Sequence, residues 1–292
     1  PSSPLRRGVA LIGLVVGVGC TLYSVWWLAG EGLDREPPVN ALALGSAQVS
    51  PLEAADPSAP GPYRVATLTY GSGLDRRRPE YGDQADLRTE PVDGTRLLEG
   101  WSGLRGALRT AYWGLGPETL PRNGQVWYPA ELIEAPDAAP LPLVVIVHGN
   151  ALMEKPSDLG YAYLGELFAS RGYLVASVDE NMFNISLARG MDLPNATDAR
   201  AWMLLEHLRL WRDWNATPGH LFYGQVDMNN IALIGHSRGG EAIAVATTFN
   251  RYAYYPDDAT LSFDYGFGIR AIAAIAPVEG QYRPTGAATP LE

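Results

Sequence analysis

Residues 231–250 read IALIGHSRGGEAIAVATTFN, and this stretch places a glycine-flanked serine between two kinds of secondary structure. Residues 231–234 are an apolar run, which is typical of a strand buried on both faces. The small and apolar residues from position 240 onward favour a helix. The stretch therefore predicts a strand, a tight turn over residues 235–240 and then a helix, with Ser237 in the turn.

Strands and helices alternate in the same way through much of the chain. Residues 141–150 (LPLVVIVHGN) and 173–181 (YLVASVDEN) predict buried strands, and apolar side chains at helical spacing predict a helix between them over residues 161–172. A second helix is predicted from about residue 198 to 215, and a further strand at residues 269–277 (IRAIAAIAP). This alternation predicts an α/β fold, with a mainly parallel sheet covered by helices on both faces.

Four shorter runs with β-type composition precede this region. They are separated by turns rich in Gly, Pro and Asp, so we expect short strands there. The runs are YRVATLTY (63–70), ADLRTEPV (85–92), LRGALRTAYW (104–113) and GQVWYPAEL (124–132).

The N-terminal segment carries no charged residue between Arg7 and Glu31. A helix of these 23 uncharged residues spans roughly 34 Å, which is enough for a hydrocarbon core of about 30 Å. Trp26 and Trp27 suit the far interface, and the basic residues before the span favour a cytoplasmic N-terminus. We expect a single-pass membrane anchor through residues 9–30 with an extracytoplasmic remainder. The alternatives are a buried globular helix and a signal peptide, whose cleavage would leave a secreted protein.

Composition narrows the class of protein and divides the chain into three segments. We expect a membrane anchor or signal segment at residues 1–30, a flexible linker rich in Pro and Ala at 31–62, and the α/β domain at 63–292.

The net charge of -10 argues against a nucleic-acid partner. Cys20 is the single cysteine, so a disulfide or thiolate cluster within the chain is excluded, and we expect no metal and no cofactor.

The turn at residues 235–240 has the G-x-S-x-G pattern and the strand-turn-helix setting of a nucleophile elbow. Ser237 must adopt a strained backbone there, and we expect Gly235 and Gly239 to leave room for it. Gly240 would permit close packing of the helix on the strand. The backbone N–H of Arg238 would stabilise a developing oxyanion. We therefore expect a catalytic serine, the alternative being an ordinary glycine turn.

A second oxyanion donor is predicted in the loop that follows the strand at residues 141–147. The stretch VIVHGN (145–150) ends that strand, and we expect the Asn150 N–H to point at the same oxygen, with His148 and Gly149 supporting the loop. Residues 179–181 (DEN) end the next strand, where they either line the site or cap the loop.

These two loops resemble the oxyanion loop and elbow of the α/β-hydrolase superfamily, over roughly residues 125–284. GHSRGG followed by IAPVEG (275–280) is similar to the chlorophyllase and dienelactone-hydrolase-like serine esterases. The resemblance implies an α/β-hydrolase fold and cleavage of a small-molecule or lipid-like carboxylic ester through an acyl-enzyme on Ser237. An acyltransferase or peptidase on the same fold, and a non-catalytic binding module that keeps the elbow, remain open.

The base and the acid that would activate the serine are missing from the expected places. The superfamily order is Ser, acid, His, yet no histidine follows Ser237. Chlorophyllases have an aspartate where this chain has Ala276, so Glu279 is the fallback acid. We interpret the sequence as a C-terminally incomplete, inactive fragment that lacks its last strands, with the base and otherwise the acid beyond Glu292. Of the histidines present, we expect three to be structural or to support a loop, and His236 to be badly placed to act on its neighbour; the three are His148, His207 and His220.

Overall fold

The computed structural model divides the chain into two compact units, Pro1–Ala55 and Asp56–Glu292. It describes residues 4–30, 54, 56–135, 139–187, 193 and 196–284, without the side chains of residues 5 and 6. Most of the predicted linker and residues 285–292 lie outside the described residues.

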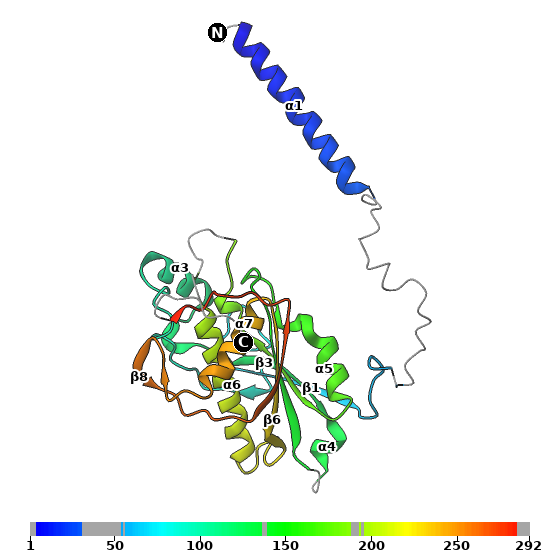
Figure 1. The fold of residues 1–292 in the computed structure, drawn as a ribbon, viewed down its shortest axis with the longest axis vertical. Helices are drawn as coiled ribbons and strands as arrows, with labels where there is room; N and C mark the ends of the chain where they lie inside the picture. The colour runs from blue at the N-terminus through cyan, green and yellow to red at the C-terminus, as the bar shows by residue number, and fades with distance from the viewer. Residues whose placement is uncertain are drawn as a thin grey trace, which may run out of the picture. The chain divides into compact units, whose positions relative to one another are not determined.

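The described part of the first unit contains one helix, α1 (Pro4–Ala29), labelled in Figure 1. Its stretch Arg7–Ala29 has 23 residues, within which an 18-residue window has a mean hydropathy of 2.0 and no buried residue. This helix is long and apolar enough to cross a membrane. Its length and composition fit an anchor and a signal sequence equally.

The second unit is built on a seven-stranded sheet, drawn in Figure 1. Only β3 runs antiparallel to its neighbours, and every other adjacent pair is parallel, which confirms the predicted mainly parallel sheet. The strands, in spatial order, are β2 (Leu87–Arg88), β1 (Val65–Gly71), β3 (Asn123–Pro129), β5 (Leu174–Asp179), β4 (Leu141–Val147), β6 (Val226–His236) and β9 (Ile269–Ile275).

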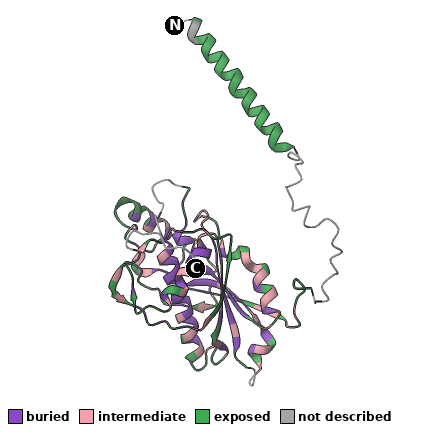
Figure 2. Cartoon of the chain, viewed as in Figure 1, coloured by how far each residue is buried: buried purple, intermediate pink, exposed green. Residues whose placement is uncertain are grey.

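Helices cover both faces of this sheet. Alternate side chains of β4 point to opposite faces. Val144 and Ile146 join the smaller core cluster with apolar side chains of α5, whereas Val145 and Val147 join the larger cluster beneath α6 and α7. Figure 2 shows the resulting buried layers on the two sides of the strands. The remaining elements are α3 (Gly103–Trp113), α4 (Ala130–Glu134), α5 (Ala162–Ala169), α6 (Thr197–Ala216), α7 (Arg238–Phe249), the hairpin of β7 (Tyr254–Tyr255) and β8 (Asp258–Ser262), and 3-10 turns at Pro117–Thr119, Asp158–Tyr161 and Asn181–Phe183.

One prediction about the early strands was wrong, and a second was confirmed only in part. Residues 104–113 form most of α3, because the buried side chains of this segment, Arg109 and Trp113, are four residues apart and share one helical face. Gly114 then ends the helix in a left-handed conformation. The segment at residues 85–92 contains the two-residue strand β2 and an isolated bridge between Val92 and Leu120, and between them Pro91 has no N–H to donate to a ladder.

The order of the strands puts the predicted turn at a switch point of the sheet. From β4 the chain passes to its neighbour β5 on one side, and then crosses back to β6 on the other side. The helix that follows β4 and the helix that follows β6 lie on opposite faces of the sheet. Loops diverge at such a switch point, and ligands of α/β sheets bind there, at the carboxyl ends of the strands. Gly149 and Ser237 lie at these two strand ends.

Candidate active site

Ser237 lies between the last residue of β6 and the first residue of α7, as predicted. Its backbone has φ 53° and ψ -119°, a conformation that L-residues rarely adopt. Among the described residues, only Ser237 and Ala276 have a positive φ without being glycine. The predicted strained turn is therefore present, and the Ser237 side chain is half-buried at its tip.

The three elbow glycines are needed for space. A Cβ added at Gly235 would overlap the Gly239 carbonyl, and one at Gly239 would lie 2.7 Å from the carbonyl oxygens of Val147 and His148. A Cβ at Gly240 would lie 2.8 Å from the Cβ of Pro277. None of the three has a positive φ. Their role is close backbone approach, which brings α7 against the ends of β4 and β9.

The loop after β4 touches the nucleophile candidate directly. A Cβ added at Gly149 would lie 2.8 Å from the Ser237 Cβ and 3.1 Å from the His236 Nδ1. The loop after β4 therefore lies beside the elbow, although 88 residues separate Gly149 from Ser237 along the chain.

His148 holds that loop through both of its ring nitrogens. Its buried Nδ1–H donates to the Gly149 carbonyl oxygen at 2.8 Å, and its Nε2 accepts the Glu180 backbone N–H at 3.0 Å. These two bonds require the neutral tautomer with the proton on Nδ1. Burial, with a further contribution from the Arg200 charge, lowers the pKa of His148 to about 4, so the ring stays neutral at physiological pH.

The orientation of the Gly149 carbonyl also sets the direction of the next N–H. The peptide bond between Gly149 and Asn150 is planar and trans, so its N–H points opposite to the carbonyl that faces the His148 ring. The Asn150 side chain accepts the Ile185 N–H at 3.1 Å, which ties the loop to the segment after β5. Within the described residues, neither the Asn150 N–H nor the Arg238 N–H donates to a protein acceptor.

Residues 179–181 do not line an open site, because all three side chains are buried. Asp179 pairs with Arg78 at 3.1 Å, and Glu180 pairs with Arg200 at 3.2 Å. Burial raises the pKa of Asp179 to about 7 and that of Glu180 to about 8. These residues form a buried ionic layer beneath the loop held by His148.

The described histidines supply no base for Ser237, since none of them hydrogen-bonds its hydroxyl. His207 is buried against the Tyr70 hydroxyl at 2.8 Å, and burial lowers its pKa to about 3. His220 stacks on Trp214 with ring centroids 5.0 Å apart. His236 is exposed at the end of β6.

Glu279, the fallback acid, is exposed in the loop after β9. Within the described part of the chain its carboxylate makes no ion pair and no contact with a histidine. No contact among the described residues therefore supports the assignment of Glu279 as the catalytic acid.

Glu241 directly follows the elbow, and the sequence analysis did not identify it. It is buried in the first turn of α7, and its Oε1 accepts the Gln281 N–H at 2.7 Å and the Tyr282 N–H at 3.0 Å. An acidic residue in the first turn of a helix is typical of favourable interaction with the helix dipole. Because an acidic residue at this position needs no further explanation, the sequence did not indicate that Glu241 contacts Gln281, 40 residues further along the chain.

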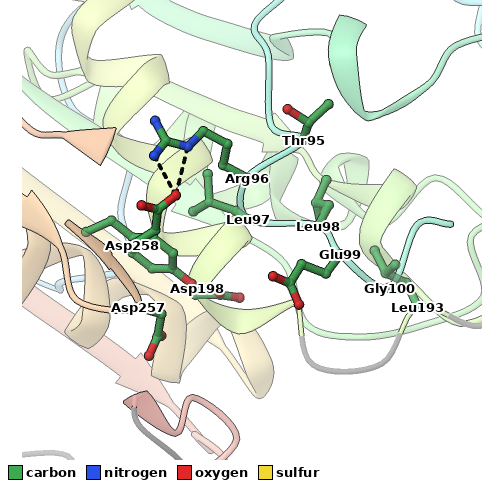
Figure 3. Close-up of a pocket in the computed structure, with 11 residues that line it drawn as sticks. Thr95, Arg96, Leu97, Leu98, Glu99, Gly100, Leu193, Asp198, Asp257 and Asp258 are labelled. Atoms are coloured by element: carbon green, nitrogen blue, oxygen red, sulfur yellow. Dashed lines mark hydrogen bonds and ion pairs between the residues drawn. The ribbon is translucent and has the colours of Figure 1, made fainter. Parts of the chain in front are cut away.

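A separate pocket of about 600 Å³ lies between the segment 95–100, the start of α6 and the β7–β8 hairpin (Figure 3). Arg96 and Asp258 both line this pocket, and they form an ion pair with the Arg96 Nη2 2.5 Å from the Asp258 Oδ2. Neither Ser237 nor the loop after β4 contributes to its lining. Among the described residues, no three His, Cys, Asp or Glu side chains converge in a way that could hold a metal ion.

Comparison with known proteins adds no relative. No protein-family model matches the chain, and no curated protein sequence matches it significantly. The geometry of Ser237 and of the loop beside it is therefore the basis for assigning a function.

Proposed function

We propose that this protein is a serine hydrolase with an α/β-hydrolase fold, which cleaves carboxylic esters through an acyl-enzyme on Ser237. The observation that carries the proposal is the backbone of Ser237, with φ 53° and ψ -119°, between a buried strand and a helix. Such strain persists only where surrounding contacts maintain it, and it concentrates at functional sites. The same turn places the half-buried Ser237 at the carboxyl edge of a mainly parallel sheet, where a nucleophile would meet its substrate.

The loop after β4 supports an acyl-transfer role. In the proposed reaction the Ser237 Oγ attacks the ester carbonyl carbon, and its proton passes to a general base. The carbonyl oxygen becomes an oxyanion, for which the N–H groups of Arg238 and Asn150 are two donors without a protein acceptor. Collapse of this intermediate expels the alcohol, and water then releases the acid product.

The identity of the base is not assigned to any described residue. The proposed reaction needs a histidine within hydrogen-bond reach of Ser237, oriented by a carboxylate. A binding module that keeps the elbow without this pair is the competing function, favoured by the lack of a described histidine on the Ser237 hydroxyl. We further propose that α1 anchors the hydrolase domain at a membrane, on its extracytoplasmic side, where the substrate is a small-molecule or lipid-like ester.

Covalent labelling of the full-length protein tests the nucleophile. A fluorophosphonate probe should label the wild type on Ser237, as located by peptide mass spectrometry, and it should not label Ser237→Ala. The matched control is Ser262→Ala, which removes an exposed hydroxyl on β8 and should label like the wild type. p-Nitrophenyl acetate hydrolysis should fall at least about 10³-fold in Ser237→Ala. A folded wild type that takes up no probe would favour the binding module.

A further inference from the structure

Ala276 and Ser237, the two described non-glycine residues with a positive φ, lie in adjacent loops and are bonded through their neighbours. Ala276 has φ 43° and follows the last residue of β9. The Ser237 N–H donates to the Ile275 carbonyl oxygen at 3.0 Å, and the Val278 N–H donates to the Ser237 carbonyl oxygen at 3.2 Å. Both backbone groups of the serine are therefore bonded to the segment around Ala276, and the Ser237 carbonyl oxygen also accepts the Gly240 N–H of α7 at 2.9 Å.

Two further contacts hold the same segment, residues 275–282, against α7. Pro277 packs so closely on Gly240 that a Cβ there would lie 2.8 Å from the Pro277 Cβ. At the far end, Glu241 accepts the N–H groups of Gln281 and Tyr282. Side chains 275–277 are exposed, so around Ala276 the segment is held mainly by the backbone hydrogen bonds to Ser237 and by the contact of Pro277 with Gly240.

The conformation of Ala276 is disfavoured for two independent reasons. A left-handed backbone is disfavoured for an L-residue, because its Cβ crowds the following carbonyl oxygen. A residue before proline is moreover driven towards the extended region, and Pro277 follows directly. A relaxed, extended Ala276 would carry Val278 away from Ser237 and break the bond to its carbonyl. The observed conformation keeps both bonds to Ser237 at once.

We propose that residues 275–278 form a backbone clamp that holds Ser237 in its strained conformation, with Ala276 as its positioning residue. This inference rests on the proposed function of Ser237 for its effect on activity, and on geometry alone for its effect on structure. The clamp acts on the serine through its own N–H and carbonyl groups, so Ala276 touches no reacting atom. A residue that tolerates a left-handed backbone should replace alanine, whereas a β-branched residue should not.

The test compares Ala276→Val with Ala276→Gly and Ala276→Asn in the full-length protein. In Ala276→Val, amide hydrogen exchange measured by NMR should be at least about 10-fold faster at Ser237 and Val278, with β4 amides unchanged. Fluorophosphonate labelling should slow at least about 10-fold, and p-nitrophenyl acetate hydrolysis should lose kcat with KM unchanged. Ala276→Gly and Ala276→Asn should stay within about 3-fold of the wild type in every readout. The matched control is Ala273→Val, which adds the same side chain to an exposed position of β9 in extended backbone.

Each outcome decides the clamp separately from the proposed function. Unchanged amide exchange in Ala276→Val, or faster exchange with wild-type labelling, overturns the clamp. A wild type that no probe labels overturns the hydrolase, and the exchange data then decide the clamp alone. If Ala276→Val does not fold, Glu241→Met replaces it, because it frees Gln281 and Tyr282 and should speed exchange at Val278.

Discussion

Gly239→Ala sets helix propensity against space in the elbow. Gly239 lies in the first turn of α7, where alanine is favoured over glycine by at most about 1 kcal/mol. The added Cβ would lie 2.7 Å from two carbonyl oxygens of the chain at the end of β4, those of Val147 and His148. β4 is paired on both sides, so these oxygens cannot retreat without disturbing the ladder.

The steric term should win. Overpacking of this kind costs about 1–3 kcal/mol, and contact with fixed backbone atoms favours the upper end. We expect Gly239→Ala to lose about 2 kcal/mol of stability in urea unfolding, which corresponds to a fall in Tm of about 4–8 °C for a domain of this size. Fluorophosphonate labelling of Ser237 should slow as well, since the elbow must move away from the loop after β4.

Gly160→Ala is the matched control. A Cβ at Gly160 would meet nothing within 4 Å, and this glycine has no positive φ. Its stability should stay within about 0.5 kcal/mol of the wild type. A Gly239→Ala variant as stable as the wild type, with unchanged labelling, would refute the assignment of Gly239 to close backbone approach.

Three further predictions concern other parts of the molecule. Burial raises the pKa of Asp198 to about 6, so the folded protein keeps a proton that the unfolded chain releases above about pH 4. The protonated Asp198 carboxyl contributes on the order of 3 kcal/mol to the free energy of unfolding below about pH 4, and this contribution is lost as the pH rises to about 6. Urea unfolding of Asp198→Asn should lack this dependence on pH. A variant with the same pH dependence as the wild type would contradict the prediction. Arg78→Met leaves Asp158 and Asp179 buried without their cation and should cost about 3–5 kcal/mol in the same assay, so a loss below 1 kcal/mol would be contrary evidence. Arginines at Val15 and Val18 each add about 2.5–3.5 kcal/mol to membrane insertion, so the double variant should leave the carbonate-resistant membrane fraction, and its retention there would argue against an anchor.

Much of the fold and part of the candidate site could be predicted from local patterns. The helix expected at about residues 198–215 is α6, Thr197–Ala216, because its apolar side chains recur at helical spacing, although the structure buries polar residues between them as well. The strand, turn and helix around Ser237 follow from an apolar run and four close glycine and serine positions. The segment at residues 104–113 was misassigned because its β-type residues did not reveal which side chains would be buried.

The sequence by itself determined the order of the buried strands and helices and the turn that contains Ser237, because residues that are close along the chain form these elements. Only the tertiary structure decided that Gly149 abuts Ser237, that His148 is held by the Glu180 N–H, and that residues 275–278 bond the serine on both sides. These contacts join segments 30 to 90 residues apart, and each of them involves a backbone group on at least one side. Every residue except proline carries the same donor and acceptor, so no pattern of side chains marks which of them will meet.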